Sequence, residues 1–134
     1  MKHFLIFTLI VFFQVFISTG CDDTITDNDI DNRIIPDSLV SFSQHLQPVF
    51  EIKCISCHDD NTKAGGLSLT TWASTTADGR VVVPGEPDNS VIVWSVTGNP
   101  AVQQMPPITS PYKPFNENQV KGLKKWIEEG AQNN

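Results

Sequence analysis

The chain has 134 residues, of which 40% are hydrophobic, and a formal net charge of −6. This length limits it to one modest domain once any targeting segment has been removed. The acidic balance, without basic patches interleaved with aromatic residues, argues against a nucleic-acid partner. Three cysteines are an odd number, which does not suit a framework built from disulfides alone.

Residues 1–20 have the pattern of a signal peptide. The apolar run from Phe4 to Ile17 follows a lysine and is too short for a comfortable membrane span. Small residues directly before Cys21 resemble the cleavage site of a bacterial lipoprotein, which makes Cys21 the expected site of lipidation. Because Ser18 stands where leucine is most usual, an ordinary secretory signal is the alternative. We therefore expect an exported protein, lipid-anchored to a bacterial membrane and facing the periplasm.

An acidic segment follows. Between Asp22 and Asp37 lie six acidic residues against the single Arg33, and aromatic residues are missing. Such composition is typical of disorder. We predict a disordered tether over residues 21–38 and a folded domain over 39–134.

The first helix of the domain is expected to begin at Ser41, because Ser41 and Gln44 have the spacing of a capping box. Apolar residues at helical spacing then define one buried face: Phe42, Leu46, Val49 and Phe50. This helix would carry the next motif at its C-terminal end.

Cys54-Ile55-Ser56-Cys57-His58 is a C-x-x-C-H sequence, the attachment pattern of a c-type haem. Each thiol can add across one vinyl group of the porphyrin, and His58 is then the proximal iron ligand. A redox-active cysteine pair and half of a zinc site are the alternatives. No βαβ pattern surrounds the motif, and further zinc ligands are missing from the sequence. With Cys54 and Cys57 on one haem c per chain and Cys21 on lipid, all three cysteines are used.

Loop signals follow His58, with Gly65-Gly66 the strongest. Ser90 is expected to cap a short helix over 91–96. The proline-rich stretch from Gly98 to Pro114 is expected to be a long loop, and loops of this length in small domains are usually either functional or disordered. In the last helix Asn116 and Gln119 form a capping box and Gly130 marks the end; its apolar stripe is Val120, Leu123 and Ile127.

Met105 is the candidate for the second axial ligand. It is the only methionine besides the initiator, lies 47 residues after His58 and is followed by two prolines that restrict the backbone. A lone methionine can also fill a gap in a core. His45 is the rival ligand, but a position 13 residues before His58 on the same helix would place it on the wrong side of the ring. If neither binds, the iron would be five-coordinate and open to small gaseous ligands.

These residues together resemble a known family. The resemblance, to the planctomycete-type cytochrome c domain among small class I cytochromes, covers about residues 41–131. Its motifs are Phe42, Pro48-Val49-Phe50, Cys54-x-x-Cys57-His58, Gly66-Leu67-Ser68-Leu69, Val83-Pro84-Gly85-x-Pro87-x-x-Ser90, Met105-Pro106-Pro107 and Trp126-Ile127-x-x-Gly130-Ala131. It implies an all-α fold with N- and C-terminal helices packed beside the haem, and with Cys54, Cys57, His58 and Met105 in the roles argued above.

One family feature is missing. Many class I cytochromes have a proline soon after the haem motif whose carbonyl orients the proximal imidazole, yet no proline occurs here between His58 and Pro84. The partner of the His58 ring is therefore unassigned. Four further side chains could pack on the haem or bond its propionates, or simply belong to the core or surface: Trp72, Arg80, Trp94 and Tyr112.

The expected function is single-electron transfer between redox proteins of unknown identity, not catalysis. The alternatives are a haem-based gas or redox sensor, in which Met105 leaves the iron, and a small haem peroxidase or oxidase component. Several lysines would form either a docking rim for partners or an ordinary solvated surface: Lys53, Lys63, Lys121, Lys124 and Lys125.

Overall fold

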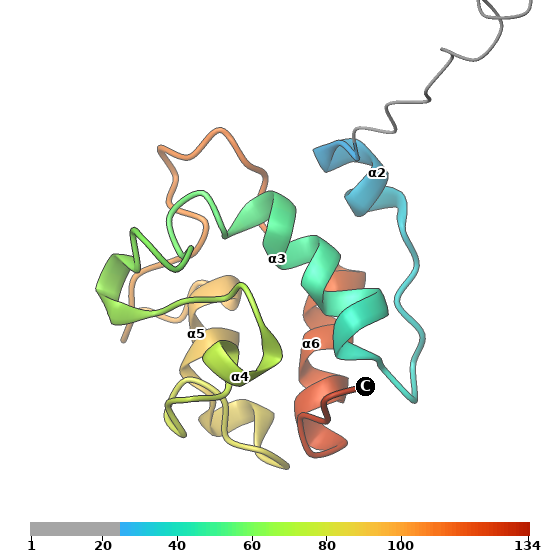
Figure 1. Cartoon of the computed structure of the whole chain (residues 1–134). Helices are drawn as coiled ribbons and strands as arrows, with labels where there is room; N and C mark the ends of the chain where they lie inside the picture. Colours follow the sequence, from blue (N-terminus) through green and yellow to red (C-terminus); the bar gives the residue numbers. More distant parts are fainter. Residues whose placement is uncertain (1–24) are drawn as a thin grey trace, which may run out of the picture.

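A computed structural model describes residues 25–134, which form helices and loops without a strand. The predicted signal peptide and Cys21 lie outside these residues. The all-α class is thus confirmed for the described part of the chain (Figure 1). Its elements are α2 (Asp27–Asn32), η1 (Phe42–Leu46), α3 (Gln47–Lys53), η2 (Ala64–Gly66), α4 (Trp72–Thr75), η3 (Pro87–Asn89), α5 (Val91–Thr97) and α6 (Glu117–Glu128). Within residues 25–134, no helix has the length and apolar character needed to cross a membrane.

The predicted first helix consists of two parts, the π-helical turn η1 and the α-helix α3. Ser41 caps η1 as predicted, since its hydroxyl accepts a hydrogen bond from the Gln44 N–H at 3.2 Å. In a capping box, a side chain of the first turn also accepts from the N–H of the cap residue. Here that acceptor is His45 and not Gln44: the Ser41 N–H donates to His45 Nδ1 at 2.8 Å. His45 therefore has a local structural contact at the start of the helix. Pro48 falls at the beginning of α3, where a missing N–H costs little.

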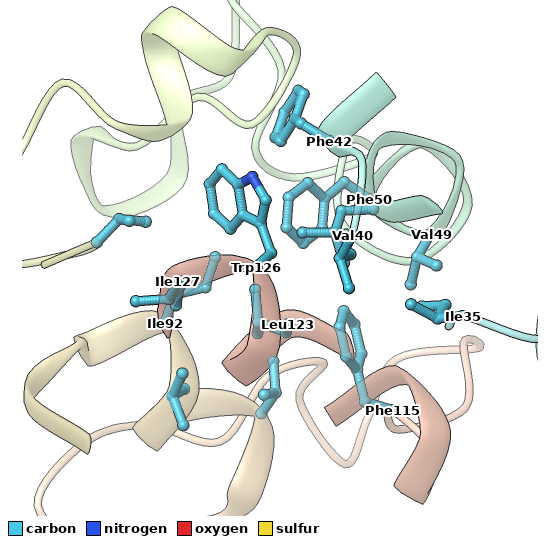
Figure 2. Packing of buried hydrophobic residues seen from close by; sticks show 14 of the residues in the cluster. Ile35, Val40, Phe42, Val49, Phe50, Ile92, Phe115, Leu123, Trp126 and Ile127 are labelled. Atoms are coloured by element: carbon cyan, nitrogen blue, oxygen red, sulfur yellow. The ribbon is translucent and has the colours of Figure 1, made fainter. Parts of the chain in front are cut away.

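The helix α6 supplies the centre of the core (Figure 2). Its predicted capping box is present, with the Asn116 side chain accepting from Gln119 N–H and the Gln119 side chain accepting from Asn116 N–H. Leu123, Trp126 and Ile127 are fully buried. The ring of Trp126 lies 5.4 Å from that of Phe42, centroid to centroid, so α6 packs on η1 where the two helices cross.

The prediction of a disordered tether is wrong for residues 25–38. Thr26 forms a complete capping box at the start of α2, and Ile30 and Ile35 are only 1% and 2% exposed. The side chain of Asn118 on α6 accepts from the Ile35 N–H at 2.8 Å and donates to the Ile35 carbonyl at 2.9 Å. This segment is therefore ordered by burial of its two isoleucines and by contacts with α6, which its acidic composition alone does not indicate.

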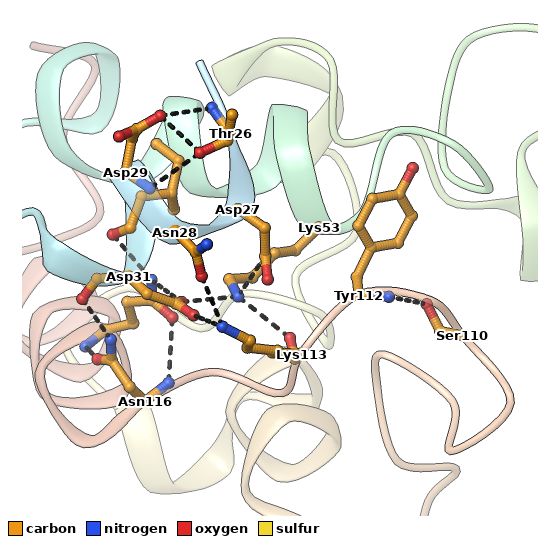
Figure 3. A network of polar contacts seen from close by, with 12 residues as sticks. Thr26, Asp27, Asn28, Asp29, Asp31, Lys53, Ser110, Tyr112, Lys113 and Asn116 are labelled. Atoms are coloured by element: carbon orange, nitrogen blue, oxygen red, sulfur yellow. Dashed lines mark hydrogen bonds and ion pairs between the residues drawn. The ribbon is translucent and has the colours of Figure 1, made fainter.

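A buried lysine links α2 to α3 (Figure 3). The side chain of Lys53 is fully buried, and its ammonium lies 2.9 Å from a carboxylate oxygen of Asp27 and 2.8 Å from one of Asp31. Its third bond goes to the backbone carbonyl of Lys113, at 3.2 Å. Burial acts to raise the pKa of Asp31, but hydrogen bonding and the charge of Lys53 outweigh it and leave that pKa lowered. Asp31 therefore stabilises the folded state above about pH 4, and this contribution is lost as pH falls.

The short helix expected after Ser90 is α5, which ends at Gly98 with a φ of 72°. Ser90 precedes it, but its buried hydroxyl does not cap the helix. Instead the hydroxyl accepts from the Val83 N–H at 2.9 Å and donates to the Glu86 carbonyl at 3.0 Å. Ser90 therefore closes the turn before α5.

Candidate functional site

A cavity with two adjoining lobes lies beside the C-x-x-C-H turn. The outer lobe has a volume of about 480 Å³ and the inner lobe about 220 Å³. Both are bordered by Cys54, His58 and Met105, so the two lobes adjoin at these residues. The size is in the range of pockets that hold cofactors. The walls of the inner lobe are largely apolar and include Phe50, Leu67, Leu69, Val81, Ile92, Val96 and Phe115.

The C-x-x-C-H residues form a tight turn directly after α3. Cys54 is the C-cap of that helix, and its carbonyl accepts from the N–H groups of Cys57 at 3.1 Å and His58 at 2.9 Å. Cys54 lines both lobes, whereas the exposed Cys57 lines only the outer one. The turn thus presents all three motif side chains to the same cavity.

The ring of His58 has a hydrogen-bond partner that the sequence left unassigned. His58 Nδ1 lies 3.3 Å from the backbone carbonyl oxygen of Leu67. Because a carbonyl can only accept, Nδ1 is the donor in this bond, and in the neutral imidazole Nε2 then keeps its lone pair. The Leu69 N–H also donates to the His58 carbonyl at 2.9 Å. Leu67 thus takes the place of the missing proline; no side-chain pattern could reveal it, since the acceptor is a backbone atom.

Met105 reaches the cavity from the proline-rich segment between α5 and α6. Its N–H donates to the Ser95 carbonyl on α5 at 2.9 Å, which ties this part of the segment to the helix. Pro106 and Pro107 border the outer lobe beside it. His45, the rival ligand, does not line either lobe. The structure therefore brings Met105 to the cavity of Cys54, Cys57 and His58, as the sequence predicts.

The Cys54 thiol does not have the character of a reactive redox cysteine. Cys54 and Cys57 are both free, and burial raises the pKa of the Cys54 thiol to about 12. A catalytic cysteine needs a lowered pKa, because the thiolate is the reactive form.

The described part of the chain contains no group of three or more His, Cys, Asp or Glu side chains that could hold a metal ion by themselves.

Of the other candidate side chains, only Tyr112 borders the cavity. The indole N–H of Trp72 donates to the Ala131 carbonyl at 2.8 Å, and that of Trp94 donates to the Asp88 carbonyl at 2.7 Å. Arg80 is paired with Asp78 at 2.8 Å. Trp72 therefore ties α4 to the C-terminal segment, whereas Trp94 and Arg80 make contacts with residues close by in the sequence.

The lysines suggested for a docking rim lie in different surroundings. Lys53 is buried in the network described above, and two members on α6 have acidic partners. Lys124 lies 2.8 Å from Asp88, and Lys125 lies 3.0 Å from Glu128. Lys63 and Lys121 are exposed.

The donors around this cavity fit a covalently held haem. Two free thiols lie on one turn, an imidazole has its Nδ1 proton engaged and Nε2 free, and a thioether lies on the same cavity. These are the groups that c-type haem chemistry uses, and apolar walls suit the porphyrin. The fold and site therefore define a small helical domain whose cavity has the donor set of a c-type haem site.

Comparison with known families agrees with this donor set. Residues 54–108 match the family described as planctomycete cytochrome C, which confirms the resemblance inferred from the sequence over that segment. The match begins at Cys54 and includes Met105, and it indicates a haem-binding, electron-transfer function with haem c as cofactor. No curated protein and no solved structure matches the chain.

Proposed function

We propose that the protein is a monohaem c-type cytochrome that passes single electrons between redox proteins. The observation that carries this proposal is the shared cavity, on which the C-x-x-C-H turn and Met105 both lie. Cys54 and Cys57 would hold the haem by thioether bonds, and His58 and Met105 would be the two axial ligands. When bound, this group supplies a one-electron Fe(II)/Fe(III) couple.

The chain's own residues would adjust that couple. The Leu67 carbonyl orients the His58 ring and makes its free nitrogen a better donor. The soft thioether of Met105 favours the reduced state and so raises the potential. The apolar inner wall would pack against the porphyrin and reduce its contact with water, which also influences the potential. With both axial positions filled, substrates and gases have no open coordination site, which is why we favour a carrier over an enzyme or sensor.

We further propose that the chain is exported and held at a bacterial membrane, facing the periplasm. Support comes from the signal-like residues 1–20, from the small residues before Cys21 and from the chemistry of the cofactor. Haem is attached to C-x-x-C-H proteins outside the cytoplasmic membrane, so such a chain needs an export signal. Redox partners would then be met close to the membrane.

The test is spectroscopic, on the full chain produced in a strain able to mature c-type cytochromes. We expect a haemochrome spectrum typical of two thioether bonds, one haem per chain by mass, and a methionine-to-iron charge-transfer band in the oxidised protein. Carbon monoxide should leave the spectrum of the reduced protein unchanged. A strain without the maturation machinery is the control. Absence of covalent haem would refute the proposal, whereas avid carbon monoxide binding would favour a sensor.

A further inference from the structure

An acidic side chain just after the haem motif holds the segment that contains Leu67. Asp60 accepts hydrogen bonds from two hydroxyls: Ser68 Oγ at 2.7 Å and Thr70 Oγ1 at 3.1 Å. The two hydroxyls are also 3.0 Å apart. Ser68 is only 6% exposed, so its bond to Asp60 is sheltered from water. We call these three side chains the Asp60 bracket.

The bracket joins the same two segments that the His58 ring joins. Residues 58–60 face residues 67–70 through the ring bond to the Leu67 carbonyl, the Leu69 N–H bond to the His58 carbonyl, and the bonds of Asp60. Leu67 and Leu69 flank Ser68, so the fixed hydroxyl lies between the two backbone groups that contact His58. Movement at Ser68 must therefore move the carbonyl that accepts from Nδ1.

The loop between these segments is held by backbone hydrogen bonds: the Ala64 N–H donates to the Cys57 carbonyl at 3.0 Å, and the Leu67 N–H donates to the Ala64 carbonyl at 3.3 Å. It is largely exposed, and it passes through the left-handed region at Lys63 (φ 42°), Gly65 (φ 64°) and Gly66 (φ 80°). Glycines leave the backbone much conformational freedom. A proline would stiffen such a loop, but none occurs there. The bracket adds a side-chain restraint to these backbone bonds, at the residue directly after the Leu67 carbonyl.

We propose that Asp60 and Ser68 are positioning residues, which hold the Leu67 carbonyl against the His58 Nδ1 proton and thereby set the orientation and donor strength of the imidazole. The inference rests on the proposed role of His58 as the proximal iron ligand. Loss of the bracket weakens the ring's hydrogen bond and makes Nε2 a poorer donor. A poorer donor favours the reduced state, so the potential rises.

Ser68→Ala is the main test, because it breaks the bracket without changing any charge. In the reduced, diamagnetic protein, the His58 Nδ1 proton should exchange with solvent roughly twofold to tenfold faster, the factor that corresponds to one net hydrogen bond. The same factor in the reduction equilibrium raises the potential by roughly 18 to 59 mV for a one-electron couple. Ser90→Ala is the matched control, since it also removes a buried, hydrogen-bonded serine hydroxyl. It should lower stability but leave the proton exchange and the potential as they are.

Asp60→Ala is a second variant, at an exposed position where the fold should tolerate the change. Removal of a negative charge near iron raises the potential by itself, so this variant is compared with Asp59→Asn. That control removes a charge one residue away but keeps an oxygen to accept from the Asn61 and Thr62 N–H groups. Faster exchange of the Nδ1 proton in Asp60→Ala and not in Asp59→Asn supports the bracket.

The outcomes separate the two proposals. If the wild-type protein carries a haem with normal methionine ligation, but Ser68→Ala and Asp60→Ala exchange the His58 proton like their controls, the bracket is purely structural and the inference is wrong. If the wild-type protein carries no covalent haem, the proposed function is wrong and the inference is overturned with it.

Discussion

Gly122→Ala tests whether residues 25–38 belong to the folded domain. Gly122 lies within α6, where alanine is intrinsically better by about 1 kcal/mol. A Cβ added there would overlap Cγ2 of Ile35 and lie 3.0 Å from its Cβ and Cδ1. Ile35 is 2% exposed, so it would have to leave its site or strain the helix.

The magnitudes favour destabilisation. Displacing a buried isoleucine costs about 1.5–3 kcal/mol, and overpacking a close contact costs about 1–3 kcal/mol. After the gain in helix propensity is subtracted, we expect a net loss of roughly 0.5–2 kcal/mol in the free energy of unfolding. For a domain of this size that corresponds to a melting temperature lower by roughly 2–10 °C.

The assay is thermal unfolding of the haem-loaded protein, followed by circular dichroism. Gly79→Ala is the control, because a Cβ there would meet nothing within 4 Å and the change should be nearly neutral. In an Ile35→Ala background the clash partner is missing, so Gly122→Ala should cost much less. Equal or higher stability of the single variant Gly122→Ala would show that the N-terminal segment does not pack on α6 and would refute the reasoning.

Four further changes test the site and its support. Cys54→Ala with Cys57→Ala should abolish covalent haem and destabilise the fold, measured by haemochrome spectra and circular dichroism; a fully stable haem-free domain would contradict this. Met105→Ala should keep the haem but lower the potential by on the order of 100 mV and admit carbon monoxide; an unmoved potential would make Met105 a packing residue. Lys53→Met should cost about 2–3 kcal/mol in denaturant unfolding, because it leaves two carboxylates without their partner; a neutral result would mean that the network adds no stability. Asn134→Ala removes the acceptor of the Phe42 N–H at 2.9 Å and should cost about 1 kcal/mol in the same assay; no change would show that water replaces it.

The parts of the fold that short-range patterns determine could be predicted from the sequence. The capping box at Asn116 and Gln119 and the apolar stripe ending at Ile127 together specify α6. The segment containing Ile30 and Ile35 was mispredicted because its acidic composition resembles disorder. Its order depends on Asn118 and Lys53, which are far away in the sequence.

The candidate site also has parts that the sequence predicts and parts that only the structure reveals. The C-x-x-C-H spacing and the lone Met105 are visible in the sequence, and the structure brings them to one cavity. The acceptor for the His58 ring is a backbone carbonyl, and any residue type has one. Only the fold can show which carbonyl comes within reach, since that depends on how a glycine-containing loop is closed.

The folded N-terminal segment changes how far the domain can stand from a membrane. Helix α2 begins at Asp27, so only five residues separate it from Cys21. Fully extended, six residue steps span at most about 22 Å. A lipid anchor at Cys21, as we propose, would therefore hold the haem domain close to the lipid surface. Electron donors and acceptors would then have to present their own redox centres at that same level, as membrane-bound complexes or as proteins that approach the bilayer.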